Sequence, residues 1–207
     1  MEPREAFFLG YLTSYVGIPF RGLDILNAAN KHSDDALAAR IAAQVDAFRS
    51  KNAETVDSVL RVEAILGKHG LARPPRPQTL ESWKQWADAA SQTAGGATAP
   101  DSAAAAALTT GGFFGDLLAA VQLQSIAKSI LDDHPGNAVL VEQLAENGKH
   151  AARAVDRIDA VLRNPALPAA AKAPLEQSVA AYRRAPDAFA TLKAELNKHV
   201  PELVNAF

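Results

Sequence analysis

Glu63 is the carboxylate whose position in the sequence most directly suggests chemistry. It falls in the apolar stripe of a helix expected from about residue 33 to Lys68, between Val59 and Leu66. A carboxylate buried among apolar side chains must be paired, hydrogen-bonded or protonated. Two interpretations stay open: Glu63 reaches water or an arginine at the edge of the stripe, or it belongs to a functional site.

Histidines are the second group with metal-binding chemistry. A ferritin-like di-iron site needs Glu-x-x-His on two helices, and the sequence contains no Glu-x-x-His. Glu146 and His150 stand four residues apart on the charged face of their expected helix, where an exposed helical pair is the simpler interpretation. The remaining histidines fall at expected helix ends, where they can interact with terminal carbonyl groups: His32, His69, His134 and His199. The alternative hypothesis is a metal-dependent enzyme that combines Glu63 with histidines at one bundle end, but no metal ligands are assigned.

Nucleophilic catalysis has little support in this sequence. The chain has no cysteine, which excludes a thiolate nucleophile and thiolate metal sites. Ser125-x-x-Lys128 occurs without the companion motifs of serine enzymes that use this spacing. The glycine-rich segment 111–115 lacks the Lys and Ser/Thr of a phosphate-binding loop, and we interpret it as a closely packed turn. The sequence therefore favours a non-enzymatic protein, and no cofactor is identified.

The residues expected to contact a ligand or partner are mainly aromatic or small. Trp83 and Trp86 follow a proline-rich segment in which Pro74 and Pro77 have the minimal spacing for proline-helix recognition. Gly148 lies in an apolar stripe and leaves room for a neighbouring helix or for a flat apolar ligand. The predicted contact set is Trp83, Trp86, Glu63, Gly148, Phe113 and Phe114.

Composition restricts the classes of partner. The 207 residues are 48% hydrophobic and 21% charged, with a formal net charge of −2, which is ordinary for a soluble globular protein. This charge balance gives no support for a nucleic-acid partner. The longest apolar candidate, 102–115, is too short for a transmembrane helix, which needs about 20 residues. No signal peptide is recognisable, so the expected location is cytoplasmic. Peripheral membrane contact through the apolar N-terminal segment stays a further possibility.

Almost every segment has helical periodicity, and no stretch alternates for long with the period of a strand. Proline and glycine positions mark the expected boundaries. The expected helices span 5–16, 21–30, 33–68, 80–92, 103–131, 138–162 and 169–200, with Pro19 and Pro201 as stops and Pro186 as a kink. The proline-rich segment 72–78 is predicted to be an extended connector, and 93–102 a flexible loop.

The segment 103–131 is the expected centre of the fold. Asp116 and Lys128 are its charged residues, and its apolar residues are spread around most of a helix, which is typical of a buried helix. A turn is expected within it at 110–112. The sequence thus predicts one all-α domain over 1–207, a bundle of about six to seven helices around an apolar central helix. Its predicted function is to bind a protein partner, a second copy of itself or an apolar small molecule.

Overall fold

The computed structural model describes residues 1–30, 36, 38, 39, 42, 43, 52–76, 78, 80–185 and 187–207, without the side chains of 17–30, 52–54, 80 and 81. Across these residues the chain forms α1 (Pro3–Asn30), α3 (Asn52–Lys68), α4 (Leu80–Gly96), α5 (Ala103–Leu131), α6 (Ala138–Leu162), α7 (Ala169–Arg184) and α8 (Phe189–Ala206). The predicted all-α class and the bundle around an apolar central helix are confirmed. The expected helix start near residue 33, together with His32, Pro77 and Pro186, lies outside the described residues.

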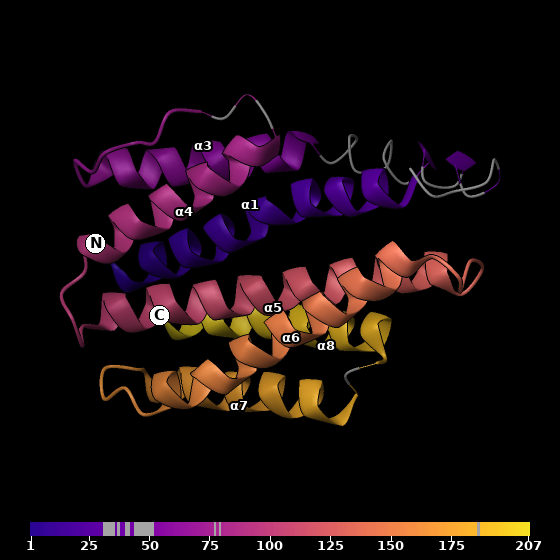
Figure 1. Cartoon of the computed structure of the whole chain (residues 1–207). Coiled ribbons are helices and arrows are strands. Elements are labelled where there is room, and N and C mark those ends of the chain that lie inside the picture. The colour runs from indigo at the N-terminus through magenta and orange to yellow at the C-terminus, as the bar shows by residue number, and fades with distance from the viewer. Residues whose placement is uncertain are drawn as a thin grey trace.

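Helices α1 and α5 lie side by side in the middle of the molecule and run in the same direction (Figure 1). Helices α3 and α4 pack on α1, whereas α6 and α8 pack on α5 and α7 packs on α8. Both termini lie at the same end of the bundle (Figure 1). The central pair therefore separates two groups of helices, and each group covers one side of it.

The two largest apolar clusters of the described residues follow from this arrangement. One joins α1 to the helices on its outer side through buried residues of three helices: Leu9, Leu12, Val16, Val59, Val62, Leu66, Trp86, Ala87, Ala90 and Ala94. The other joins α1 and α5 to α6, α7 and α8, and its largest fully buried side chains include Phe7, Phe114, Leu117, Ile158 and Leu175. The apolar N-terminal segment contributes to both clusters, so within the fold its apolar faces pack against helices on two sides.

Helix α5 is continuous, which corrects the turn expected at 110–112. Ser102 caps its start by accepting a hydrogen bond from the Ala105 amide at 3.1 Å. The glycines act in packing: a Cβ atom on Gly111 would lie only 2.1 Å from the carbonyl oxygen of Phe7 in α1. A side chain cannot fit at that distance, so glycine here permits close contact between two backbones and does not mark a turn.

Three other expected boundaries are wrong. Helix α1 continues through Pro19 to Asn30, α4 continues to Gly96, and α8 passes Pro201 and ends at Ala206. Proline and glycine lower helix propensity locally, but tertiary packing can override propensity. In α8 the turn after Pro201 buries Leu203 and Val204, which favours the helical continuation. The loop predicted at 93–102 is correspondingly shorter, and the single last helix is divided into α7 and α8.

Other local predictions are confirmed. Gly70 follows α3 with a positive φ of 66°, the conformation in which glycine commonly ends a helix. The Asn137 side chain accepts a hydrogen bond from the Leu140 amide at 3.2 Å, as expected of a helix cap. These residues fix helix ends through short-range geometry, which is why the sequence alone was sufficient to predict them.

Helix α5 is long and apolar enough to cross a membrane by length and composition, and it is the helix of the described chain that meets this test. In its most apolar window, 67% of the residues are buried inside the fold. The core helix of a globular bundle has the same length and composition. The candidate 102–115 was judged too short because it ended before the charged residue Asp116, whereas the helix continues through Asp116 to Leu131.

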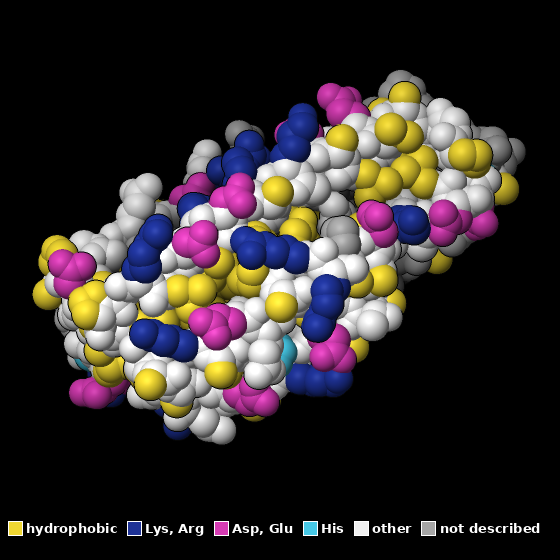
Figure 2. All heavy atoms as spheres, turned by 90° about the horizontal axis from the view of Figure 1, so that it is seen from below, with side chains coloured by type: hydrophobic (Ala, Val, Ile, Leu, Met, Phe, Trp, Pro, Cys, Tyr) yellow, Lys and Arg dark blue, Asp and Glu magenta, His cyan; other side chains and the backbone are white. Residues whose placement is uncertain are grey.

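The face of the bundle that lies underneath in the view of Figure 1 carries both basic and acidic side chains. Basic and acidic side chains alternate across it, with hydrophobic side chains visible between them (Figure 2). No large region of one sign is visible on this face among the side chains that the structure describes. This face therefore offers no electrostatic reason to expect a polyanionic partner, and the prediction that nucleic acid is not a partner stays a prediction.

Glu5 links the start of α1 to the end of α3. Its Oε1 accepts a hydrogen bond from Lys68 Nζ at 2.5 Å, and its Oε2 lies 2.7 Å from His69 Nε2. Hydrogen bonds from the Lys68 and His69 side chains lower the pKa of Glu5 from 4.5 to about 2, against a smaller opposing effect of burial. His69 thus lies at a helix end as expected, but its contact is with a carboxylate of another helix.

We expect this contact to make stability depend on acidity. The pKa of Glu5 is lower in the folded protein, about 2, than the ordinary value of 4.5. Its stabilising contribution is therefore complete above pH 4.5 and is lost as the pH falls toward 2. Solvent screening limits the contribution to about 1 kcal/mol. Urea unfolding followed by circular dichroism should show that Glu5→Gln reduces the loss of stability between pH 4.5 and pH 2.

The matched control for this prediction is Glu142→Gln, which removes an exposed carboxylate of α6. It should leave the acid-dependent loss of stability as it is in the wild type. If Glu5→Gln and the wild type lose the same free energy of unfolding over that interval, the assignment to Glu5 is wrong.

Candidate binding groove between α4 and α6

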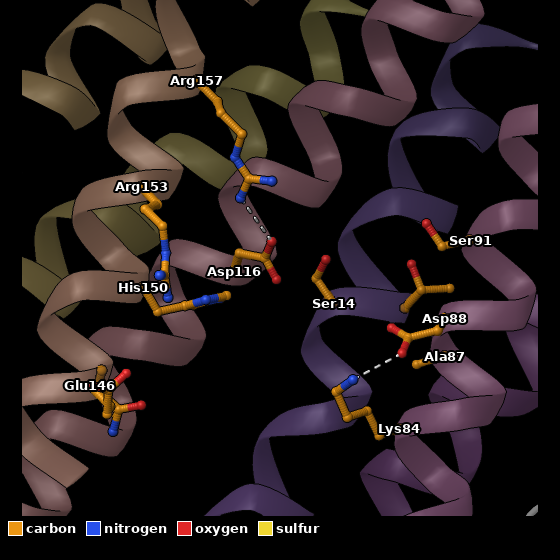
Figure 3. A pocket seen from close by; sticks show the side chains of 12 residues that line it. Ser14, Lys84, Ala87, Asp88, Ser91, Asp116, Glu146, His150, Arg153 and Arg157 are labelled. Atoms are coloured by element: carbon orange, nitrogen blue, oxygen red, sulfur yellow. Dashed lines mark hydrogen bonds and ion pairs between the residues drawn. The ribbon is translucent and has the colours of Figure 1, made fainter. Parts of the chain in front are cut away.

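A polar cavity of about 540 Å³ opens between α4 and α6, with α1 and α5 at its base (Figure 3). Its volume lies within the usual range for small-molecule sites, about 300–1,000 Å³. The described side chains that line it come from four helices: Thr13, Ser14, Lys84, Ala87, Asp88, Ser91, Asp116, Glu146, Asn147, His150, Arg153 and Arg157.

Helical periodicity explains why these side chains converge. Along α6, Glu146, His150, Arg153 and Arg157 are separated by steps of four, three and four, which keep them on one helix face. The opposite face of α6 carries Ala151, Val155 and Ile158 into the core. Packing of the apolar face against α5 therefore turns the charged face toward α4 across the cavity.

Ion pairs account for most of the charges around the cavity. On α4, Lys84 Nζ lies 3.1 Å from Asp88 Oδ2, and across the base Arg157 Nη2 lies 3.8 Å from Asp116 Oδ2. Arg153 has no ion-pair partner within 4.0 Å among the residues that the structure describes. It extends beside His150 on the α6 wall (Figure 3). The wall therefore offers one guanidinium group to a ligand.

Glu146 already has a hydrogen-bond partner on its own helix. Its Oε1 accepts a hydrogen bond from Lys149 Nζ at 2.7 Å. This hydrogen bond is the main reason that the pKa of Glu146 is lowered, and the positive charge of Arg153 adds a smaller effect in the same direction. Glu146 therefore stays ionised and is satisfied by Lys149, whereas the pair interpreted from the sequence was Glu146 with His150.

A second cavity of about 310 Å³ adjoins the first and is mainly apolar. The two share Ser14, Ser91, Asp116 and Arg157. The rest of the second cavity is lined by small and apolar residues of α1, α4, α5 and α6: Gly10, Gly95, Leu108, Thr109, Gly112, Phe113, Ala154, Ile158 and Val161. We refer to the two cavities together as the α4–α6 groove, which is polar at one end and apolar at the other.

Buried amides lie next to the polar end of the groove. Asn147 Nδ2 and Gln124 Oε1 are buried and have no hydrogen-bond partner in the described part of the chain. A Cβ atom on Gly148 would lie 3.3 Å from Gln124 Nε2. Gly148 thus makes room for the Gln124 amide at the α5–α6 contact, where the sequence suggested room for a helix or a flat ligand.

The predicted contact residues are dispersed over the structure. Phe113 lines the apolar end of the groove, whereas Phe114 is fully buried in the core. Trp86 is buried beside the proline-rich connector, and the ring centroid of Trp83 lies 6.2 Å from that of Trp86. The structure therefore brings one member of the predicted set, Phe113, to the groove and places the others elsewhere.

Glu63 finds its partner in the connector. Arg76 Nε donates hydrogen bonds to both carboxylate oxygens of Glu63, at 2.9 and 3.2 Å, and Nη2 donates to Oε2 at 2.7 Å. These hydrogen bonds lower the pKa of Glu63. Of the two interpretations left open, pairing with an arginine is the one that the geometry shows.

In the described ranges, no group of three or more His, Asp or Glu side chains could hold a metal ion. His199 is not at a helix end but buried within α8, where its Nδ1 lies 3.0 Å from Glu202 Oε2. The metal-dependent alternative stays a prediction that elemental analysis of the purified protein tests.

Apart from Phe113, the groove residues were not predicted as contact residues, because they are ordinary charged and small residues until the helices are placed in space. The one signal in the sequence was Asp116, which is one of two charges in the apolar segment 103–131. A lone carboxylate in a helix that is otherwise buried needs a partner or water. Asp116 indeed faces the groove and Arg157.

Comparison with models of known protein families, with curated proteins and with solved structures finds no significant match. The function must therefore be argued from the groove itself.

Proposed function

We propose that the protein binds a small amphiphilic carboxylate in the α4–α6 groove, with the carboxylate at the polar end and the hydrocarbon chain at the apolar end. One observation carries this proposal: two adjoining cavities, the first lined mainly by polar and charged residues and the second mainly by small and apolar ones, share Ser14, Ser91, Asp116 and Arg157. A ligand that fills both must itself be polar at one end and apolar at the other. The predicted binding function is kept, and the ligand changes from apolar to amphiphilic.

The charges favour an anionic head group. Arg153 is the groove cation without an ion-pair partner in the described part of the chain, whereas Lys84 and Arg157 each have a carboxylate nearby. A guanidinium group can bind a carboxylate through two parallel hydrogen bonds, which adds both strength and orientation. His150 lies beside Arg153 (Figure 3) and offers a further ring nitrogen to the same group.

The apolar end suits a single hydrocarbon chain. Gly10 and Gly112 form its floor where α1 and α5 touch, and Phe113, Ile158 and Val161 form its sides. Gly10 lets the two backbones approach here, since a Cβ atom on it would lie 2.1 Å from the Leu108 carbonyl oxygen of α5. Each square ångström of apolar ligand surface removed from water contributes about 25 cal/mol, so the chain supplies affinity while Arg153 supplies orientation.

The test is a comparison of decanoate, decanol and decyltrimethylammonium by isothermal titration calorimetry below their aggregation concentrations. Decanoate should bind most tightly. Arg153→Ala should weaken decanoate binding about tenfold or more, because a hydrogen bond to a charged group contributes about 1.5–3 kcal/mol. Decanol affinity should change little in the same variant, since it lacks the charge that Arg153 recognises.

The matched control is Arg183→Ala, which removes an exposed arginine of α7 away from the groove. A second variant, Thr109→Trp, places a large side chain at an exposed position of the apolar end and should reduce binding of both decanoate and decanol. Equal decanoate affinity in Arg153→Ala and Arg183→Ala, or a preference for the cationic amphiphile, contradicts the proposal.

A further inference from the structure

The two cavities of the α4–α6 groove meet at polar side chains from each of the helices that form the groove. We call this set the junction: Ser14 of α1, Ser91 of α4, Asp116 of α5 and Arg157 of α6. On each helix, the residue four positions away lines the apolar end: Gly10, Gly95, Gly112 and Val161. Because residues four apart lie one turn apart on the same helix face, the lining changes from apolar to polar at the junction on every helix of the groove.

Contact between α1 and α5 holds Ser14 beside Asp116. A Cβ atom on Gly115 would lie 2.7 Å from the Cβ atom of Ser14, and a Cβ atom on Gly112 would lie 3.8 Å from Ser14 Oγ. Ser14 therefore packs against the α5 backbone, next to the turn from which Asp116 faces the groove (Figure 3). Helix packing thus fixes a hydroxyl group and a carboxylate at the same place in the groove.

Asp116 has unused capacity to accept hydrogen bonds. Arg157 Nη2 lies 3.8 Å from Asp116 Oδ2, which is an ion pair but longer than a hydrogen bond. Within the described part of the chain, the side chains of Asp116, Ser14 and Ser91 make no hydrogen bond. The Asp116 side chain is 28% exposed, so a ligand in the groove can reach it.

A plain hydrocarbon chain fits the junction poorly. Methylene groups over the Asp116 carboxylate would displace its water without offering a donor, which costs free energy. A carboxylate only accepts hydrogen bonds and a guanidinium group only donates them. A ligand group that donates to Asp116 and accepts from Arg157 or a serine must therefore do both. A hydroxyl group does both, whereas a ketone oxygen only accepts and an ammonium group only donates.

We infer that the ligand of the groove is a hydroxy acid, whose chain hydroxyl donates a hydrogen bond to Asp116 while its carboxylate binds Arg153. This inference rests on the proposed function and names the class of ligand within it. Arg153 and Arg157 are four residues apart, about 6 Å along α6, which an extended chain spans in about four carbon–carbon bonds. The hydroxyl group therefore belongs near C5 of the acid.

Acids of equal chain length test this by isothermal titration calorimetry, as sodium salts below their aggregation concentrations. 5-Hydroxydecanoate should bind about tenfold more tightly than decanoate, because a hydrogen bond to a charged group is among the stronger ones. 5-Oxodecanoate cannot donate and should gain nothing over decanoate. 10-Hydroxydecanoate should bind more weakly than decanoate, because its hydroxyl group would be buried at the apolar end.

Two variants assign the effect to Asp116. Asp116→Ala removes the acceptor and should bring the affinities of 5-hydroxydecanoate and decanoate together. Arg157 loses its ion pair in this variant, so both acids may be bound more tightly than by the wild type, and the ratio of the two affinities is the readout. The matched control is Asp159→Ala, which removes an exposed carboxylate of α6 that lines neither cavity and should keep the preference for the hydroxy acid.

The results separate this inference from the proposed function. If decanoate binds and Arg153→Ala weakens it, but 5-hydroxydecanoate binds no more tightly, the inference is wrong and the proposed function stands. A gain in affinity that 5-oxodecanoate reproduces, or a preference for the hydroxy acid that survives in Asp116→Ala, also overturns the inference. If none of the acids binds, both proposals fail. The comparison of acids uses the wild-type protein, so it decides the matter even if Asp116→Ala does not fold.

Discussion

Gly111→Ala will destabilise the protein by about 3 kcal/mol, the upper end of the usual cost of overpacking a core. The added methyl group would lie 2.1 Å from the Phe7 carbonyl oxygen and 3.0 Å from the Tyr11 amide nitrogen. Both are backbone atoms of α1, so no side-chain rotation can relieve the clash. The two central helices must separate, and the apolar contacts on both sides of them weaken. Thermal and urea unfolding followed by circular dichroism measure the loss of unfolding free energy.

The matched control is the neighbouring residue. A Cβ atom on Gly112 would meet nothing closer than Ser14 Oγ at 3.8 Å, which is an ordinary contact. Gly112→Ala should therefore raise stability by about 0.5–1 kcal/mol, because alanine is the better residue inside a helix. Alanine is therefore expected to lower stability at Gly111 and to raise it at Gly112. Equal changes in the free energy of unfolding at the two positions would show that the α1–α5 contact is looser than described.

Phe114→Ala will cost about 3–5 kcal/mol, the range for removing a buried aromatic side chain. Phe114 is 0% exposed and belongs to the cluster that joins α1 and α5 to α6, α7 and α8. The surrounding helices come from distant parts of the sequence and cannot all collapse into the space left by the ring. The measurement is the midpoint of urea unfolding together with the dependence of the unfolding free energy on urea concentration.

Phe8→Ala is the matched comparison, since Phe8 is a phenylalanine of α1 that is only partly buried. It should cost roughly half as much or less, because the Phe8 ring is only partly buried and its removal loses less apolar contact shielded from water. If the two variants unfold at the same urea concentration, Phe114 is not the packing centre that its burial indicates.

The helical architecture was predictable because apolar periodicity and caps are local properties of the chain. The stripe through Leu140, Ala151, Val155 and Ile158 predicted α6 and its buried face. The segment Thr110-Gly111-Gly112 was misinterpreted as a turn because the role of its glycines depends on α1, which is far away in sequence. No local pattern states that a second backbone lies 2.1 Å from the position of a missing Cβ atom.

The candidate site was less accessible to sequence reasoning for the same reason. Phe113 was selected as an aromatic contact and does line the groove, but Arg153 is an ordinary charged residue of an exposed helix face until α4 is placed opposite it. Trp86 was selected for its neighbouring prolines, and the structure adds that its indole nitrogen is buried without an acceptor in the described chain. Residue type suggested where to look, whereas only the fold shows which charges remain unpaired.

The contact of α1 with α5 also has a consequence for biosynthesis. Helix α1 is synthesised before α5, the partner that covers its glycine-bearing face, and α3 and α4 lie between the two in the sequence. Pairings between distant segments form slowly, and apolar surface left waiting is prone to aggregation. The nascent chain therefore passes through a period in which Phe7 and its neighbours have no native cover, which is when a molecular chaperone would be of most use.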